Sequence, residues 1–340
     1  MIIRKHSKKY NFVGNQENGV TFRWGINLKD NPKSAPWPEL ADISISNHCS
    51  KQCNFCYRNS KPDGSFISLS NYKFILDNLS DKKWGKVFQV AIGGGEPTEH
   101  PDLIEILKIT RQRGIIPNYT TNGEIVSMEI LDATKKFCGA VAISINNFTI
   151  TKQEIIKKFI NKKIKTNIHF ILSKKSINNA VKILNGDFDE YLKGVNSVIF
   201  LTYKPFGRAI KENMLEKGVS FNNFIKLIDK PKTKLRFGFD ACFVPTLMKY
   251  TSVNTDFIDS CECGFFSVYI DENLNVKPCS FTNNDDFTIN LKNKTFKDIW
   301  QNYYEKYRQI NTKTNKCSSC NANNICRGIC PYFYQINLCQ

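Results

Sequence analysis

The sequence has no long hydrophobic run and no visible export signal. No apolar stretch approaches the roughly 18 residues that a membrane span needs. The N-terminal residues, MIIRKHSKKY, contain neither an apolar core nor a small-residue cleavage site, so no signal peptide is predicted. We therefore expect a cytoplasmic protein without a membrane partner, whose cysteines remain reduced thiols.

Long tracts of one charge are also absent, although 48 Lys and Arg residues against 31 Asp and Glu give a formal net charge of +17. The basic residues stand singly or in pairs from Lys5 to Lys316. A bias across the whole composition explains this distribution as well as a binding surface does. Since no recognition helix or aromatic stacking motif is visible, nucleic acid is not the expected partner.

Neither end of the chain, 1–38 or 261–340, shows an internal repeat or a low-complexity linker. A length of 340 residues, 41% of them hydrophobic, predicts about two domains or one large barrel with an appendage. We predict an N-terminal extension over 1–38, an α/β domain over 39–235, a bridging segment over 236–260 and a cysteine-rich module over 261–340.

Short β-rich runs alternate with amphipathic helical stretches between the first cysteines and about residue 210. This pattern is typical of a parallel sheet built from βα units, either a partial barrel or an open doubly wound sheet. In both folds, functional residues gather at the carboxyl ends of the strands. Thr151 and Glu154 predict a capping box at the start of one helix. The predicted strands are Ala41–Ser46, Val87–Ile92, Ile115–Thr120, Ala140–Ile145, Thr166–Leu172 and Val198–Tyr203.

The 13 cysteines are the most informative residues, and three of them form a tight group, Cys49-x3-Cys53-x2-Cys56. Three thiolates on one loop leave one position of a metal centre open. A structural zinc site needs four ligands, and the neighbouring His48 adjoins Cys49 too closely to complete one easily. Thiolates select iron–sulfur clusters equally well, and three cysteines on a cubane leave one iron free.

The triplet, the aromatic Phe55 before its last cysteine and the segment GGGEP at 93–97 together resemble the radical S-adenosylmethionine (SAM) superfamily. This resemblance implies a partial (β/α)6 TIM-like barrel. It also implies a [4Fe–4S] cluster whose open iron chelates the methionine part of SAM. Reduction by this cluster would cleave SAM to methionine and a 5′-deoxyadenosyl radical.

The resemblance also assigns cofactor-binding residues. The glycine turn would let the backbone approach the methionine ammonium group, Asn122 lies in the turn after the third strand, and Ser144 ends the fourth strand where a hydroxyl commonly meets the ribose. The residues expected to bind the cofactor are Phe55, Gly93, Gly94, Gly95, Glu96, Asn122, Ser144 and Arg208.

A second group of cysteines lies near the C-terminus, with the spacing Cys317-x2-Cys320-x5-Cys326-x3-Cys330, followed by Cys339. It resembles the SPASM domain, which carries two auxiliary [4Fe–4S] clusters; a zinc ribbon is the alternative. Where that domain usually has a glycine, this chain has Leu274, with asparagines on either side to make the turn. The resemblance implies two ligand sets, namely Cys261, Cys263, Cys279 and Cys330 for one cluster, and Cys317, Cys320, Cys326 and Cys339 for the other.

Two cysteines are left over. Cys138 is most simply a small buried hydrophobic residue. Cys242 lies where a thiol could donate a hydrogen atom to a substrate radical, with Asp240 as the group that accepts a proton. The spacing between Cys261 and Cys263 is unusually tight. Cys242 is therefore alternatively a ligand in place of Cys261, or that cluster keeps an open iron for substrate.

Relatives with such a module mostly modify peptides or proteins. We therefore expect a thioether or carbon–carbon crosslink in a ribosomally made precursor, with a flavodoxin or ferredoxin as electron donor. Oxidation to formylglycine is disfavoured, because Ser280 stands where sulfatase-maturing relatives place an aspartate. The alternatives are peptide epimerisation, modification of RNA or a small molecule by the same chemistry, and a zinc-stabilised nucleic-acid-binding protein.

Overall fold

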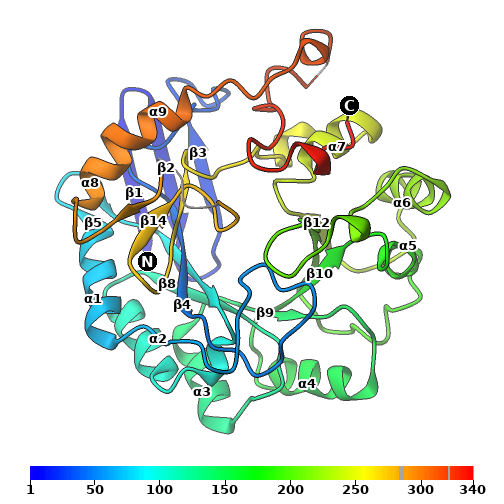
Figure 1. Cartoon of the computed structure of the whole chain (residues 1–340), viewed down its shortest axis with the longest axis horizontal. Coiled ribbons are helices and arrows are strands. Elements are labelled where there is room, and N and C mark those ends of the chain that lie inside the picture. Colours follow the sequence, from blue (N-terminus) through cyan, green and yellow to red (C-terminus); the bar gives the residue numbers. More distant parts are fainter. Residues whose placement is uncertain (283–286, 321, 340) are drawn as a thin grey trace. The chain divides into compact units, whose positions relative to one another are not determined.

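The computed structural model describes residues 1–282, 287–320 and 322–339, and the chain divides into two compact units (Figure 1). Each unit is assembled from stretches that are far apart in the sequence. The first unit comprises Met1–Gln52, Ser60–Val141 and Cys263–Ile310. The second unit comprises Cys53–Asn59, Ala142–Glu262 and Asn311–Gln340. No helix within the described ranges is both long and apolar enough to cross a membrane.

The first unit opens with an antiparallel sheet of β1 (Ile2–Ser7), β2 (Tyr10–Asn15) and β3 (Thr21–Trp24). The aromatic residues of β2 are buried, and the ring of Phe12 meets the ring of Phe88 edge to face at 5.6 Å. The N-terminal extension thus packs into a hydrophobic core of the first unit.

Three parallel strands follow in the first unit, β4 (Leu40–Ser46), β7 (Gln89–Gly94) and β8 (Ile116–Thr121). Buried residues alternate with half-buried ones along most of β7 and β8, and Ala41, Ile43 and Ile45 of β4 are fully buried. Helix α2 contacts both α1 and α3 (Figure 1). The remaining elements of this stretch are α1 (Leu69–Asn78), β5 (Ser80–Asp81), β6 (Gly85–Lys86), η1 (Pro97–Glu99), α2 (Leu103–Gln112) and α3 (Met128–Phe137).

The cysteine-rich end of the chain adds strands to the same sheet. Strand β13 (Ser267–Ile270) pairs in parallel with β4 and in antiparallel with β14 (Asn275–Lys277), which in turn pairs with β15 (Ile289–Asn290). Trp300 is 1% exposed and donates a hydrogen bond to the carbonyl oxygen of Ala35 at 3.2 Å. The helical segments here are α8 (Phe296–Asp298), η4 (Ile299–Tyr303) and α9 (Tyr304–Arg308).

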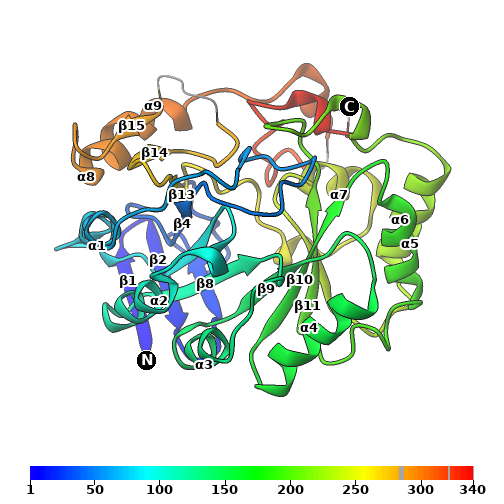
Figure 2. The same cartoon turned by 60° about the horizontal axis from the view of Figure 1, so that its bottom comes forward.

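The second unit holds a further parallel ladder in which β10 pairs with β11, and β11 with β12. Phe200 of β11 lies 5.3 Å from Phe224 of α6 and 5.4 Å from Phe239 of β12, measured between ring centroids. Helices α5 and α6 run side by side (Figure 2). These elements are β9 (Val141–Ser144), α4 (Ile150–Asn161), β10 (Thr166–Leu172), α5 (Ile177–Asn185), β11 (Ser197–Thr202), α6 (Val219–Asp229), β12 (Phe237–Phe239) and α7 (Val244–Tyr250).

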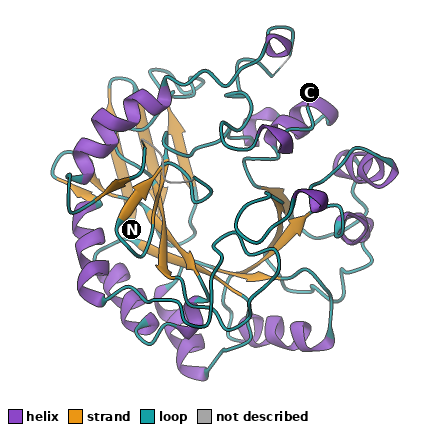
Figure 3. Cartoon of the chain, in the orientation of Figure 1, coloured by secondary structure: helices purple, strands orange, loops and turns teal. Residues whose placement is uncertain are grey.

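Among the described residues of this unit, the other regular elements are short helical turns (Figure 3). They are η2 (Lys211–Asn213), η3 (Thr255–Phe257), η5 (Asn315–Cys317) and η6 (Tyr334–Ile336).

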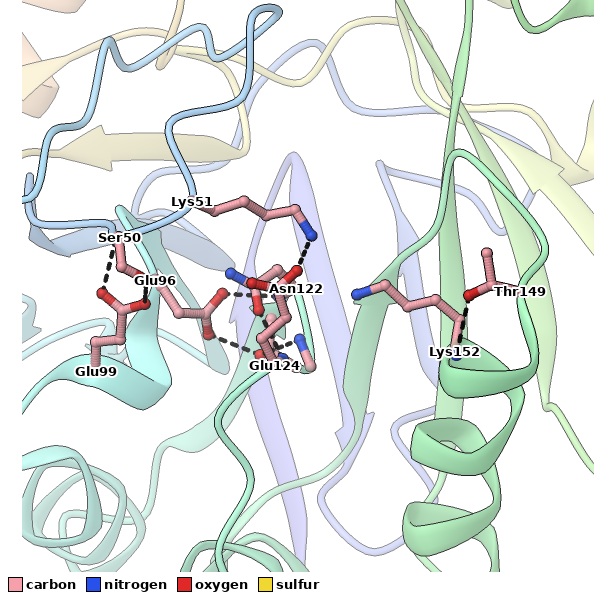
Figure 4. Close-up of polar contacts among 10 residues, drawn as sticks. Ser50, Lys51, Glu96, Glu99, Asn122, Glu124, Thr149 and Lys152 are labelled. Carbon is pink, nitrogen blue, oxygen red and sulfur yellow. Dashed lines mark hydrogen bonds and ion pairs between the residues drawn. The ribbon is translucent and has the colours of Figure 1, made fainter.

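All six predicted strands are present, with ends shifted by at most two residues. The predicted capping box of Thr151 and Glu154 is wrong. Helix α4 begins at Ile150, and the hydroxyl of Thr149 accepts the hydrogen bond from the backbone N–H of Lys152 at 3.3 Å (Figure 4). Thr149 takes this role because its backbone is extended, whereas Thr151 already lies inside the helix.

The turn between β13 and β14 is formed differently from the prediction. Leu274 itself adopts a left-handed conformation, with φ of +70°, where the flanking asparagines were expected to make the turn. Asp271 accepts hydrogen bonds from the backbone N–H groups of Asn273 and Asn275 and so fixes the loop. Leu274 is 1% exposed, and burial of its side chain offsets the strain.

We predict that Leu274→Gly destabilises the protein, although glycine relieves the backbone strain. Removing a buried leucine side chain costs about 2–5 kcal/mol, while the relieved strain returns about 1 kcal/mol. The net loss of about 1–4 kcal/mol is measurable by urea unfolding followed by tryptophan fluorescence. A more stable variant would show that strain, and not burial, dominates this turn.

Candidate functional site

The predicted cysteine triplet lies on the segment that follows strand β4. Cys49 belongs to the first unit, whereas Cys53 and Cys56 belong to the second. The side chains of all three are half-buried.

Backbone hydrogen bonds in the first unit fasten the segment around Cys49 to the glycine turn. The N–H of Gly95 donates to the carbonyl oxygen of Ser46 at 2.8 Å, and the N–H of Glu96 donates to that of His48 at 2.9 Å. The N–H of Cys49 donates to the carbonyl oxygen of Lys61 at 2.9 Å. The backbone around this cysteine is therefore held from two sides.

The three glycines of the turn have different surroundings. A Cβ atom on Gly95 would lie 1.8 Å from the carbonyl oxygen of His48, so only glycine fits this close approach. Gly94 has φ of +111°, which also favours glycine. A Cβ atom on Gly93 would meet nothing within 4 Å. The turn is thus packed at Gly95 and borders open space at Gly93.

Glu96 is a buried carboxylate with four hydrogen bonds from protein donors. Its Oε1 accepts from the N–H of Thr98 at 3.1 Å, from the hydroxyl of Thr98 at 2.8 Å and from that of Thr121 at 2.7 Å. Its Oε2 accepts from the N–H of Asn122 at 2.7 Å (Figure 4). Burial raises the pKa of Glu96, and the four hydrogen bonds oppose this shift. Two of the expected cofactor residues, Glu96 and Asn122, thus tie the end of β7 to the end of β8.

Glu99 was not predicted, and it contacts both neighbours of Cys49. Its Oε2 lies 3.0 Å from Nε2 of His48 and accepts a hydrogen bond from the N–H of Ser50 at 3.0 Å. Its Oε1 accepts from the hydroxyl of Ser50 at 2.6 Å (Figure 4). No sequence motif marks this residue, because the contact joins segments 49 residues apart.

In the second unit, Gly207 and Arg208 hold the segment that carries Cys53 and Cys56. The Nε of Arg208 donates to the carbonyl oxygen of Cys53 at 2.8 Å, and its backbone N–H donates to that of Cys56 at 3.0 Å. A Cβ atom on Gly207 would lie 2.5 Å from the carbonyl oxygen of Cys56. The described contacts of Arg208 are therefore with the cysteine segment; Phe55 and Ser144, also in this unit, are half-buried.

Asp240 lies in a buried polar cluster of the second unit. Its Oδ1 accepts from the hydroxyl of Thr202 at 2.6 Å, and its Oδ2 lies 3.0 Å from Nζ of the buried Lys204. Burial lowers the pKa of His169 to about 4, while the charge of Asp240 opposes this shift. The half-buried Cys242 follows in the turn before α7.

The four cysteines of the second predicted auxiliary set interact electrostatically in the second unit. Burial raises the pKa of the Cys339 thiol, and the charges of Cys326, Cys317 and Cys320 raise it further. Backbone N–H groups point at two of the sulfurs, from Thr314 to Cys317 and from Gly328 to Cys326, both at 3.4 Å. N–H···S contacts of this kind tune iron–sulfur ligands.

The other predicted auxiliary set is divided, with Cys263 and Cys279 in the first unit and Cys261 and Cys330 in the second. Over residues 1–282, 287–320 and 322–339, no three Cys, His or acidic side chains form a ready-made site for a single metal ion. Cys138 caps the end of α3, and burial raises the pKa of its thiol to about 12.

Residues 43–196 match the family described as "Radical SAM superfamily". The chain therefore contains a radical SAM domain over these residues, and this family of domains implies a [4Fe–4S] cluster and SAM. The residues present fit these groups, because the three cysteines follow one another closely on the segment after β4, and in the first unit the glycine turn bonded to the Cys49 segment borders open space at Gly93.

Two curated relatives show how far the similarity extends. The chain is 24% identical over 258 residues to a 7,8-dihydro-6-hydroxymethylpterin dimethyltransferase of Methanocaldococcus jannaschii, an alignment that covers 67% of this chain and 49% of the relative. It is 30% identical over 91 residues to a PqqA peptide cyclase of Bradyrhizobium diazoefficiens, covering 26% and 23%. The chain thus spans half or less of the length of either relative.

Among solved structures, SuiB of Streptococcus suis bound to S-adenosylmethionine superimposes with a TM-score of 0.73 at 17% identity, covering 97% of this chain and 94% of SuiB. SuiB bound to its precursor peptide SuiA gives a TM-score of 0.72 at 18% identity, with coverages of 99% and 100%. The likeness confirms the predicted fold class, an α/β partial barrel with a cysteine-rich C-terminal part.

We predict that alanine at Gly95 lowers the stability of the protein, whereas alanine at Gly93 weakens SAM binding. Gly95→Ala forces a shift of the His48 backbone and should lower the unfolding temperature of the iron-free protein by several degrees. Gly93→Ala should leave that temperature unchanged and instead weaken SAM binding at least about tenfold, since the methyl group enters the open space. Calorimetry of both variants tests this, and unchanged SAM affinity in Gly93→Ala would contradict it.

Proposed function

We propose that the protein is a radical SAM enzyme that modifies a peptide. The observation that carries this proposal is the arrangement at the end of β4, where the Cys49 backbone is fastened to a glycine turn that borders open space at Gly93. This arrangement suits a cluster and the small amino-acid part of SAM lying against exposed backbone.

Cys49, Cys53 and Cys56 would hold the cluster, which when bound supplies the electron that splits SAM into methionine and a 5′-deoxyadenosyl radical. Gly93, Gly94 and Gly95 would present backbone groups to the methionine part. Asn122, Ser144, Phe55 and Arg208 complete the proposed cofactor site. Glu96 acts through Asn122, whose backbone N–H it holds at 2.7 Å.

We propose a peptide as substrate and a crosslink as product. The support is the likeness to SuiB, solved with its precursor peptide, and to a peptide cyclase. Hydrogen-atom abstraction from a carbon–hydrogen bond gives 5′-deoxyadenosine and a substrate radical. As the new thioether or carbon–carbon bond closes, a second hydrogen would leave as a proton, and an auxiliary cluster, when bound, would accept the remaining electron. A flavodoxin or ferredoxin supplies the reducing electron.

The auxiliary clusters are proposed on the two cysteine sets. Electrostatic proximity and the N–H···S contacts support the set of Cys317, Cys320, Cys326 and Cys339. The set of Cys261, Cys263, Cys279 and Cys330 rests on spacing.

Cys242 and Asp240 remain the proposed catalytic pair. The ion pair with Lys204 and the hydrogen bond from Thr202 hold the Asp240 carboxylate in place two residues before Cys242. These contacts support Asp240 as an anchor of the turn, and its role as a proton acceptor is proposed from its place beside Cys242 in the sequence.

The function is tested by anaerobic reconstitution of the full chain with SAM, a reductant and a co-expressed precursor peptide. A crosslinked product is lighter by two hydrogens, whereas an epimerised product keeps its mass and gains deuterium from solvent. Brown protein with about twelve irons per chain supports three clusters, whereas a colourless zinc protein would contradict the proposal.

We predict that Cys53→Ala abolishes release of 5′-deoxyadenosine, because a cluster with two remaining thiolates is not held. Chromatography of quenched reactions measures the release. Cys138→Ala is the matched control, since this thiol lies outside the proposed ligand sets, and it should cleave SAM like the wild type. Continued release by the Cys53 variant would overturn the mechanism.

We predict that Cys339→Ala lowers the iron content by about four per chain and stops crosslink formation, while SAM cleavage continues. Iron analysis and peptide mass spectrometry on the same sample check this. Full iron content in the variant would remove Cys339 from the ligand set.

A further inference from the structure

Glu99 uses both of its carboxylate oxygens on the two residues that flank Cys49. One oxygen lies 3.0 Å from His48 Nε2 and 3.0 Å from the backbone nitrogen of Ser50, and the other accepts from the Ser50 hydroxyl at 2.6 Å. The Glu99 side chain is only 6% exposed. One side chain therefore fixes the backbone on both sides of a proposed cluster ligand.

The element that carries Glu99 is itself held in place. Glu96 caps η1 by accepting from the N–H of Thr98, and the same carboxylate binds Thr121 and Asn122 at the end of β8. Pro97 at the start of η1 restricts the backbone further. Glu99 thus presents its carboxylate from a rigid support.

An ordinary surface ion pair looks different. Glu105 of α2 binds Lys108 at 3.0 Å, but the two side chains are 40% and 44% exposed, and the pair joins adjacent turns of one helix. Such pairs contribute little. The Glu99 contacts join η1 to the cysteine segment, and two of the three are with groups of Ser50, directly after Cys49.

We propose that Glu99 is a positioning residue for the SAM-binding cluster, which directs the Cys49 thiolate by holding residues 48 and 50. This inference rests on the proposed function. The contacts depend on the length of the Glu99 side chain and not on its charge. A glutamine at 99 keeps an oxygen for the Ser50 N–H and an amide that can donate to the Ser50 hydroxyl. An aspartate keeps the charge but is one methylene too short.

The test compares full-length Glu99→Ala, Glu99→Asp and Glu99→Gln with the wild type after anaerobic reconstitution. Glu105→Ala is the control. The readouts are iron per chain and the change that SAM produces in the electron paramagnetic resonance spectrum of the reduced protein, which reports only on the cluster with an open iron. Unfolding of the iron-free chain checks that each variant is folded.

In the Ala and Asp variants, the amplitude of the SAM-dependent spectral change should fall about tenfold or more. Their iron content should be lower than that of the wild type by up to about four per chain. The Gln and Glu105→Ala variants should resemble the wild type. A wild-type spectrum in Glu99→Ala or Glu99→Asp, or its loss in a folded Glu99→Gln, would overturn the positioning role. Absence of any SAM-dependent change in the wild type would instead refute the proposed function.

Discussion

The close approach between the glycine turn and the cysteine segment is the contact on which the first unit's part of the site depends. At Gly95 the backbones come so near that a single methyl group would overlap the His48 carbonyl oxygen. The N–H groups of Gly95 and Glu96 donate to the carbonyl oxygens of Ser46 and His48, so the chain stays hydrogen-bonded beyond the last residue of β4. Because these bonds satisfy backbone groups on the residues before Cys49, they fix the backbone that leads to this cysteine.

Burying Glu96 is costly, and the four donors around it are what make the burial tolerable. Those donors come from η1 and from the end of β8, so the desolvation of the carboxylate is compensated only when both elements are correctly placed. Burial of Glu96 therefore favours the native arrangement of η1 and β8. It couples the glycine turn to the turn that contains Asn122 without touching the cysteine segment.

The sequence predicted the parallel strands well, because short β-rich runs with buried residues such as Ile43, Val90 and Ile168 stand out between the helical stretches, and it located the motifs at the strand ends. It did not reveal Glu99, since a carboxylate that bonds residues 49 positions away leaves no periodic signal. It also misplaced the cap of α4, because Thr149 and Thr151 are equally good capping residues and only the backbone distinguishes them. At Leu274 the expected turn exists, but tertiary burial overrides the local preference for glycine or asparagine.

The pairing of β13 with β4 gives the cysteine-rich end of the chain a defined register in the first unit. Ser267 of β13 lies beside Leu40, so the strand that leads to Cys49 also aligns the segment that follows Cys263. The buried Ser44 hydroxyl donates to Glu272 at 2.6 Å and adds a side-chain link between β4 and the β13–β14 turn. Gly94 lies against the same hydroxyl, where a Cβ atom would be 2.4 Å away. The glycine turn, β4 and the hairpin between Cys263 and Cys279 are therefore packed against one another, with Ser44 as the residue that contacts both of the other two.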